Sequence, residues 1–524
     1  MVKEQKSDHK EHIEAGKRTA GVASSIIMGR LLAVALSGIA FIIVARILGP
    51  STYGIFTVAI AFATFFGAFG DIGVGTAFSK LVGQHLAKND IKSMSEVLSN
   101  GYAIMIITSV IFTIIALMSS GLVAHYALGN RSYTYIVQVA SLIIFISVMY
   151  SASYYAIIGF GKSTYIALTI LIQSILQSVI SIMLVYMKFG AMGPIIGAIV
   201  GYSIGLIFAI FVIVRKFGIR FKMPSLGSMK SLLKFSAPIS VYTGLRGIVN
   251  NLSPILLGLF ATTVIVGNYG VALKTANLFL LVTDSITFAL LPTFASTLSI
   301  ESLGRSINKL YNYAVYVTFV IMVPAMFYIA VLAKQFSYTA FSASYLFTPS
   351  YISVIAIGVL FWAIATYTTM LLIGRNLVND VLRYAILIAI MEFILMFTLI
   401  PLFNGYGLVV LLYVISPVVL SSLAVMIASK KLQIHLDTKK LIKVVAAGAI
   451  SALLLLPIEY LLGNYILILM LGVAEQLLVY PPLLSLVGGA SKDDLKTIKE
   501  LSGKLPIISF ILRTLSDYSA YFAR

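Results

Sequence analysis

The sequence predicts an all-α polytopic membrane protein with about fourteen transmembrane helices. Hydrophobic residues fill 60% of the 524 positions and charged residues only 10%, which is too apolar for a surface that faces water. A helix needs about 20 apolar residues to cross the hydrocarbon core of a bilayer. Fourteen nearly uncharged runs are long enough: 22–47, 53–70, 97–123, 133–158, 164–187, 191–214, 235–260, 264–291, 310–333, 350–373, 384–400, 406–428, 441–462 and 464–487.

The placement of the basic residues predicts the orientation. If the N-terminus is inside, thirty of the 37 Lys and Arg residues fall in the two termini and the loops on that side, and the opposite side carries only Arg46, Arg131, Lys188 and Lys334. Cytoplasmic loops of membrane proteins carry such an excess of positive charge. A missed or invented crossing would scramble this alternation. We therefore expect an even number of helices in the cell membrane, with both termini cytoplasmic.

Composition and motifs also exclude several functional classes. The net charge of +19 is explained by the loops at the membrane surface, so we expect no nucleic-acid partner. The chain has no Cys, which excludes disulfides and thiolate metal sites, and its five His residues are isolated. No GxxxxGK[ST], HExxH or Gly-x-Ser-x-Gly motif with a plausible base is present. We expect neither an enzyme nor a bound cofactor or metal.

The longest polar interruption, 215–234, carries six basic residues and separates two groups of six helices. The predicted organisation is a cytoplasmic tail (1–21), an N lobe (22–214), a basic cytoplasmic linker (215–234), a C lobe (235–429), two further helices (430–487) and a cytoplasmic tail (488–524). The last two helices have no counterpart in either lobe.

The two lobes show signs of an internal repeat. A shift of 216 residues places Arg30 on Arg246 and Tyr53-Gly54 on Tyr269-Gly270. Internal repeats of this kind are typical of secondary transporters. Because each lobe has an even number of helices, the lobes should be related by a pseudo-twofold axis along the membrane normal and should flank a central cleft.

Three basic residues lie inside predicted membrane helices. A charge there costs about 2.5 to 3.5 kcal/mol on insertion scales, so water or an anion should meet it. At 1.5 Å per residue, Arg30, Arg246 and Lys274 lie near the middle of the membrane. Two Arg forks and a mobile Lys suit a phosphate or diphosphate, so these residues are candidates for substrate binding. The alternative is three separate structural residues that bond carbonyls or extend towards the interface.

Four acidic residues and a polar patch complete the candidate site. Asp71 and Asp284 fall near the cytoplasmic interface and could close a gate with basic loops, although helix capping or solvation also explains them. Glu392 and Glu475 lie deeper and could couple transport to a proton or sodium gradient, with a structural hydrogen bond as the alternative. Tyr and Phe are ordinary interfacial anchors and do not by themselves predict a sugar-binding platform.

The seventh predicted span contains a polar patch next to a proline. This patch, Asn250, Asn251, Ser253 and Pro254, should permit a kink or an unwound turn, because Pro removes a backbone hydrogen bond. We therefore expect a hinge here that flexes between inward and outward states.

Two segments resemble a known family. The stretch from Ala45 to Gly54, ARILGPSTYG, and the stretch from Phe69 to Ala77, FGDIGVGTA, resemble the start of polysaccharide-type flippases of the multidrug/oligosaccharidyl-lipid/polysaccharide (MOP) superfamily. Lipid II flippases and O-antigen unit flippases have this plan. The resemblance implies a V-shaped, two-lobed transporter with cationic residues in its cleft and final helices that can hold a lipid tail. The chain has fewer Arg in its first two helices than the lipid II type, which leaves a mono- or diphosphate headgroup open.

The expected function is therefore translocation of a polyprenyl- or dolichyl-linked oligosaccharide across the cytoplasmic membrane by alternating access. The expected partners are this substrate, membrane lipids and a proton or sodium gradient, and we expect a monomer. The alternative is an ion-coupled multidrug antiporter of the same superfamily, which should favour acids over Arg in its cleft. A non-transporting scaffold would leave the midplane charges unexplained.

Overall fold

The computed structural model describes most of the chain. Backbone and side chains are described for 32–71, 73–234, 236, 247–280, 307–375, 377–492, 494–496 and 517–522, and the backbone alone for 2–31, 235, 237–246, 281–298 and 304–306. Contacts divide the chain into two compact units, Met1–Gly270 and Val271–Arg524.

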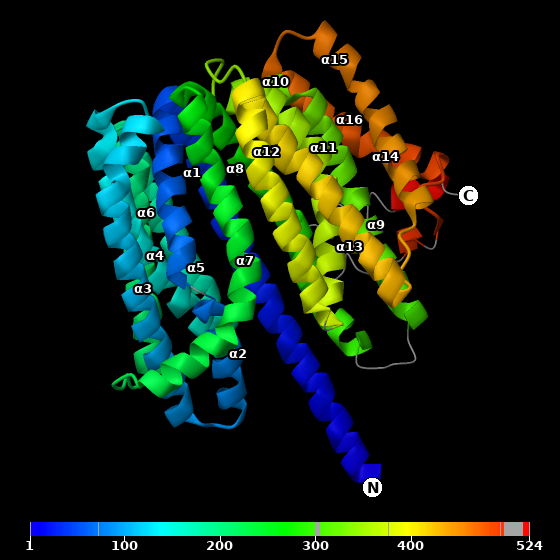
Figure 1. Cartoon of the computed structure of the whole chain (residues 1–524). Coiled ribbons are helices and arrows are strands. Elements are labelled where there is room, and N and C mark those ends of the chain that lie inside the picture. The colour runs from blue at the N-terminus through cyan, green and yellow to red at the C-terminus, as the bar shows by residue number, and fades with distance from the viewer. Residues whose placement is uncertain are drawn as a thin grey trace. The chain divides into compact units, whose positions relative to one another are not determined.

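The first unit contains seven helices and the start of an eighth (Figure 1). They are α1 (Val2–Asp71), α2 (Val74–Ala87), α3 (Ile91–Tyr126), α4 (Thr134–Gly159), α5 (Ser163–Tyr186), α6 (Met192–Phe211), α7 (Leu226–Phe260) and α8 (Thr263–Leu298).

Helix α1 covers two predicted spans. It is broken at Gly49, where φ is 68° and ψ is 169°, a conformation that favours glycine. Pro50 follows directly and begins the second part of the helix. The break lies between the predicted runs 22–47 and 53–70, as expected for a turn between two crossings.

Four glycines join α5 and α6 closely. Gly193, Gly197, Gly201 and Gly205 recur every four residues and therefore lie along one face of α6. A Cβ on Gly197 would lie 2.9 Å from the carbonyl oxygen of Gln177, and one on Gly201 would lie 2.8 Å from that of Gln173 in α5. Small residues allow membrane helices to approach this closely. The facing side of α5 is polar, and the Gln173 amide donates to Gln177 at 2.5 Å.

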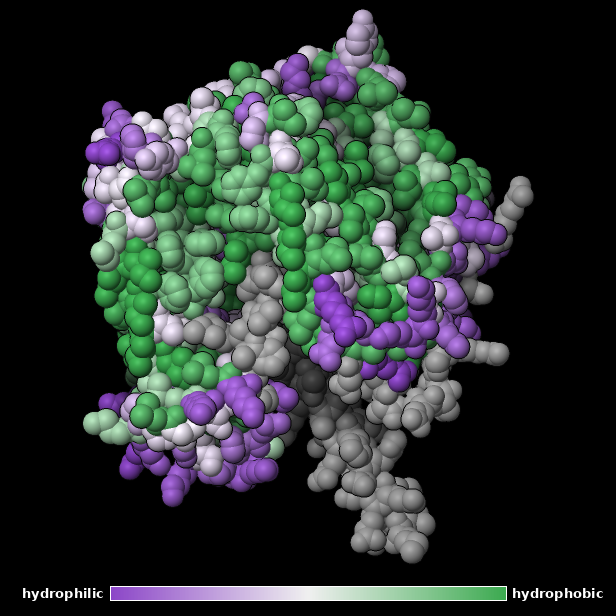
Figure 2. Space-filling view, in the orientation of Figure 1, coloured by the Kyte–Doolittle hydropathy of each residue, from purple (hydrophilic) through white to green (hydrophobic). Residues whose placement is uncertain are grey.

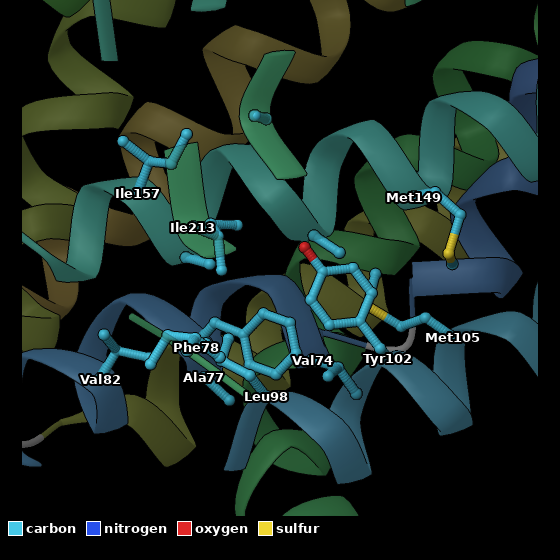
Figure 3. Packing of buried hydrophobic residues seen from close by; sticks show 14 of the residues in the cluster. Val74, Ala77, Phe78, Val82, Leu98, Tyr102, Met105, Met149, Ile157 and Ile213 are labelled. Atoms are coloured by element: carbon cyan, nitrogen blue, oxygen red, sulfur yellow. The ribbon is translucent and has the colours of Figure 1, made fainter. Parts of the chain in front are cut away.

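Helix α2 packs into a core between α3 and α4. Phe78 is fully buried and lies beside Tyr102 of α3, with ring centroids 5.6 Å apart (Figure 3). The hydroxyl groups of Tyr102 and Ser153 are 2.6 Å apart, which joins α3 to α4. In Figure 2 an apolar band covers the middle of α3, while hydrophilic residues gather at the ends of α2 and α3. The exposed side chains of α3 include Ile107, Ile111 and Ile114, as expected for a lipid-facing surface.

An extended segment follows α6 and lies along α3; we call it the N strap (219–225). Its backbone amides donate to α3 side chains: Lys222 N to Ser99 Oγ at 2.8 Å, and Ser225 N to Asn100 Oδ1 at 2.8 Å. A longer bond joins Arg220 N to Ser95 Oγ at 3.4 Å. The predicted basic linker is therefore fixed to the first unit, and it leads into α7, which also contacts α2 and α3 (Figure 1).

Among its described residues, the second unit contains the remainder of α8 and helices α9 to α16. They are α9 (Gly304–Val331), α10 (Ala333–Ala340), α11 (Thr348–Gly374), α12 (Val378–Val410), α13 (Ser416–Leu432), α14 (Thr438–Leu453), α15 (Leu455–Leu461) and α16 (Tyr465–Leu486).

Helices α11 and α12 show a second close approach and a second break. Gly358 of α11 lies directly against the carbonyl of Tyr413, which belongs to a π-helical turn between α12 and α13. A π turn widens the helix locally. Asn404 has φ 51° and ψ −134° within α12, near Pro401. This break lies between the predicted runs 384–400 and 406–428.

A second extended segment follows α13 and lies along α9; we call it the C strap (433–437). His435 N donates to Asn308 Oδ1 at 3.0 Å, and Asp437 N donates to Asn312 Oδ1 at 2.7 Å. The Asn312 amide also donates to the His435 carbonyl at 2.7 Å. The C strap ends at Asp437, whose carboxylate caps α14 by accepting from Lys440 N at 3.1 Å.

The last helices pack on α9 and α10. Gly448 of α14 lies against Val323, and the Tyr328 hydroxyl donates to the Leu469 carbonyl of α16 at 2.9 Å. At the first turn of α14, Lys440 pairs with Asp494 at 2.6 Å. Helices α14 to α16 are thus anchored within the second unit.

Ten helical segments among the described residues are long and apolar enough to cross a membrane. Two of them, Leu32–Asp71 and Val378–Leu432, each cover two of the predicted runs. The fold is an all-α polytopic membrane protein, as predicted, and the count of fourteen stays a prediction. Helices α2 and α10 lie in segments that the sequence assigned to loops.

Candidate functional site

Helix α1 crosses the start of α8 through a reciprocal contact. A Cβ on Gly54 would clash with the Thr263 carbonyl oxygen, and one on Gly267 would clash with the Pro50 carbonyl oxygen. The Ser51 and Thr263 hydroxyls are 3.0 Å apart at the same crossing. Each glycine thus meets the carbonyl four residues before its partner glycine. The contact relates Gly54 to Gly267, a shift of 213, whereas the sequence comparison matched Gly54 with Gly270.

The predicted hinge patch of α7 lies against α1 and α8. Thr64 Oγ1 donates to Asn251 Oδ1 at 3.0 Å, and the hydroxyls of Ser253 and Tyr269 are 3.2 Å apart. Ser253 Oγ also donates to the Asn250 carbonyl at 2.8 Å. That carbonyl is the one that Pro254 cannot bond, because Pro has no N–H. The backbone of α7 stays helical through Pro254, so the expected unwound turn is absent here, and flexing at this patch stays a prediction.

Of the three predicted phosphate-binding residues, the structure describes the side chain of one. Lys274 is exposed on α8, about 16 Å from the start of that helix at 1.5 Å per residue. None of the ion pairs recorded among the described side chains involves it. Arg30 lies in α1 and Arg246 in α7 next to Gly247, and both side chains lie outside the described residues. How the three are arranged stays a prediction.

Asp71 lies where α1 turns into α2. Its Oδ1 accepts from Gly75 N at 3.0 Å, and its Oδ2 lies 3.5 Å from Ser151 Oγ of α4. Thr108 Oγ1 of α3 donates to the Gly70 carbonyl at 2.7 Å. The carboxylate is therefore within the helix bundle, about 12 Å before Gly159 at the end of α4. The bond from Gly75 N joins Asp71 to the first turn of α2, which agrees with the capping alternative. The predicted gate, including Asp284 outside the described side chains, stays a prediction.

The two deeper acids each have a serine partner. Glu392 of α12 is 8% exposed and accepts a short hydrogen bond from Ser416 Oγ, at the start of α13. Glu475 of α16 accepts from Ser451 Oγ of α14 at 2.9 Å and from Gln476 Nε2 at 2.8 Å. Both carboxyls thus join neighbouring helices. Such contacts suit a structural role and also a proton-binding group, so ion coupling stays a prediction.

A set of tyrosines on α4 was not singled out by the sequence. Tyr150 and Tyr154 stack at 6.3 Å with an interplanar angle of 9°, and Tyr154 lies 5.6 Å from Tyr155. Tyr150 also contacts Tyr202 of α6, with ring centroids 5.3 Å apart. All four are half-buried. The signal was the spacing SxxYSxxYY in 147–155, which the abundance of aromatic residues elsewhere in the chain obscured.

Comparison with known proteins identifies the family. A profile of the polysaccharide biosynthesis protein family matches residues 20–298, more than half of the chain. The chain belongs to this family. A search of curated protein sequences finds no match.

Solved structures share the fold of this chain. The lipid II flippase MurJ in an inward closed conformation superimposes with a TM-score of 0.72 at 16% identity, covering 88% of this chain and 98% of the other. An inward-facing multidrug resistance MATE family transporter gives a TM-score of 0.64 at 16% identity over 79% of this chain and 98% of the other. A MOP superfamily transporter from Pyrococcus furiosus gives 0.53 at 18% identity, covering 80% and 96%.

Proposed function

We propose that this protein is a flippase that moves a polyprenyl- or dolichyl-linked oligosaccharide across the cytoplasmic membrane by alternating access. The family match, which names polysaccharide biosynthesis, is the observation that carries the proposal. The fold adds support, because the MurJ match covers 88% of the chain and the match to a MATE family transporter covers 79%.

The phosphate of the substrate would bind Arg30, Arg246 and Lys274. The support is chemical: guanidinium forks and an ammonium group match phosphate, and cations inside membrane helices are costly unless an anion or water meets them. Lys274 is exposed on its helix. Sugar would cross within the protein while the prenyl chain stays in lipid.

The remaining candidates would drive the cycle. Glu392 and Glu475 are the proposed sites of coupling to a proton or sodium gradient. Asp71 and Asp284 are proposed gate residues, and they differ by 213, the shift that the Gly54–Gly267 contact also shows. Flexing at the Asn250–Pro254 patch would accompany the change between states.

Transport in liposomes tests the proposal. The purified protein is reconstituted with a fluorescent polyprenyl-diphosphate oligosaccharide, and a membrane-impermeant quencher reports the fraction that reaches the other leaflet. We expect Arg30→Ala and Arg246→Ala to slow transport by about tenfold or more, because each removes a charge-assisted contact to phosphate. Arg131→Ala, in an exposed turn, is the charge-matched control. Equal rates for all four proteins would reject the phosphate site.

The alternative is an ion-coupled multidrug antiporter, which the match to a MATE family transporter supports. The same liposomes distinguish the two, with a lipophilic cation as the probe. Uptake of the cation against a proton gradient, unaffected by Arg30→Ala and Arg246→Ala and without lipid translocation, would favour the antiporter.

A further inference from the structure

The half of α4 nearer Gly159 carries an accessible polar face, whereas the same face is buried in the half that begins at Thr134. At about 100° per residue, Tyr150, Ser151 and Tyr154 lie about 80 to 180° around the helix from Leu142. Leu142 is 45% exposed and belongs to the outward stripe that includes Tyr135. The polar face therefore points away from the exposed apolar stripe.

The side chains in this sector of α4 become more exposed along the helix towards Gly159. In the half of α4 that begins at Thr134, the residues in this sector are all buried: Ile136, Val137, Ala140, Ile143 and Ile144. Towards Gly159 the residues in this sector are half-buried: Ser147, Tyr150, Ser151, Tyr154, Tyr155 and Ile158. Buried residues make up 61% of an 18-residue apolar stretch of α4, against 28% of such stretches of α3 and of α5. Neighbouring helices therefore cover α4 more than they cover α3 or α5. The half-buried residues of this sector are therefore the accessible polar surface of a helix that its neighbours otherwise cover.

Contacts with neighbouring helices identify what faces this surface. A Cβ on Gly75 of α2 would lie 2.8 Å from the Tyr155 ring and 3.2 Å from Asp71 Oδ1, so ring and carboxylate meet at this glycine. A Cβ on Gly205 of α6 would lie 2.8 Å from the Tyr150 ring. The tyrosine row thus runs from the Asp71 carboxylate to α6.

We propose that this face, formed by Asp71, Tyr150, Ser151, Tyr154 and Tyr155, binds the saccharide portion of the substrate. The proposal rests on the proposed flippase function. Sugar rings present apolar C–H faces and hydroxyl edges, and they need both flat aromatic surfaces and hydrogen-bond acceptors. Half-buried tyrosines offer an apolar ring with a polar end, and the Asp71 carboxylate offers acceptors to hydroxyls. An interfacial aromatic belt would face lipid, whereas this row faces away from the apolar stripe of its own helix.

The test compares two probes that differ only in their sugar: a polyprenyl diphosphate with a disaccharide and the same lipid without it. Equilibrium binding is measured on the full chain in detergent. We expect Tyr154→Leu to weaken binding of the sugar-bearing lipid by about tenfold and to leave binding of the sugar-free lipid unchanged. Tyr154→Phe, which keeps the ring, should bind both within about twofold of the parent.

Two controls keep the outcome decisive. Tyr135→Leu removes a tyrosine from the outward stripe of the same helix and should change neither affinity. Asp71→Asn keeps an acceptor for Gly75 and should selectively weaken the sugar-bearing lipid, and the midpoint of thermal unfolding shows whether each variant is folded. Equal weakening of both probes by Tyr154→Leu, or no weakening of either, overturns the saccharide face. If the parent binds neither probe, the flippase function itself is rejected.

Discussion

The N strap and the C strap are each held to a helix by backbone amides that donate to its side chains, but the acceptor residues differ. Each follows a helix, runs extended along another helix, and donates alternate backbone amides to side chains one helical turn apart. In the first unit the acceptors include Ser95 and Ser99, and in the second they are Asn308 and Asn312. Both pairs are related by a shift of 213, the shift seen at Gly54 and Gly267.

Simple geometry explains why the arrangement recurs. Two residues of an extended chain span about 6.6 Å, and four residues of a helix span about 6 Å, so alternate amides meet every fourth helical residue. Any short side chain with an acceptor oxygen can serve. The difference lies in burial: Ser99 and Asn100 are 5% and 2% exposed, whereas the bonds of the C strap are exposed. Removing an acceptor in the N strap should therefore lower the free energy of unfolding more than removing one in the C strap.

The largest expected effect is in the N strap. Asn100→Leu removes the acceptor of the Ser225 amide at a buried position, and we expect the free energy of unfolding to fall by about 2 kcal/mol. Thermal unfolding in detergent measures the loss, and hydrogen exchange should show faster exchange of the Ser225 amide. Unchanged exchange there would contradict the assigned bond.

A second prediction concerns acid sensitivity in the second unit, where an ion pair anchors the helix that follows the C strap. Burial opposes ionisation of Asp494, but hydrogen bonds from Lys440 and Ser491 outweigh it, and the pKa of Asp494 lies below its ordinary value. A lowered pKa stabilises the fold above about pH 4, and this stabilisation is lost as pH falls through the folded pKa. Asp494→Asn should remove about 1.5 kcal/mol at neutral pH.

The pH profile provides the check on that pair. The difference in thermal unfolding midpoint between the parent and Asp494→Asn should shrink as the pH falls from 6 to 3. A difference that stays constant over this range would show that the carboxylate charge does not stabilise the fold.

A smaller loss is expected in the C strap. Asn312→Leu removes the acceptor of the Asp437 amide and the donor to the His435 carbonyl, but water can replace exposed partners. We expect a loss of about 1 kcal/mol, less than for Asn100→Leu, by the same unfolding measurement. The reverse order would refute burial as the cause of the difference between the straps.

The smallest effect tests whether the acceptors are interchangeable. Asn308→Ser places in the C strap the residue type that Ser95 supplies in the N strap. We expect less than about 0.5 kcal/mol of change and retained hydrogen-exchange protection of the His435 amide. Asn308→Ala, which has no acceptor, is the matched variant and should lose that protection. Loss of protection in both would mean that the asparagine is specifically required.

The sequence predicted the membrane class and most helices because their signal, long apolar runs, is local. Helix α2 was missed because Lys80 and His85 lower the hydropathy of its 14 residues, and only packing against α3 and α4 shows its place. The straps were missed for another reason. Their bonds use backbone amides, which every residue except Pro possesses, so no side chain in 219–225 or 433–437 marks them.

The candidate site was predicted as unevenly as the fold. Charged residues such as Lys274 and Glu392 stand out within apolar runs because a membrane charge is costly. The tyrosine face of α4 does not stand out, since tyrosine occurs 29 times in the chain. Tyr150 and Tyr154 are distinguished by their exposure, because the same side of α4 is buried earlier in the helix. Packing of neighbouring helices determines that exposure, and the sequence does not show it.

The reciprocal crossing of α1 and α8 bears on the ancestry of the chain. Gly54 and Gly267 make the same contact twice, each against a carbonyl that the other segment supplies. Self-complementary contacts of this form are those by which identical subunits pair about a twofold axis. A protein half as long could have made this contact with a second copy of itself. Gene fusion would then have turned an interface between subunits into a crossing within one chain, leaving each half free to acquire different substitutions.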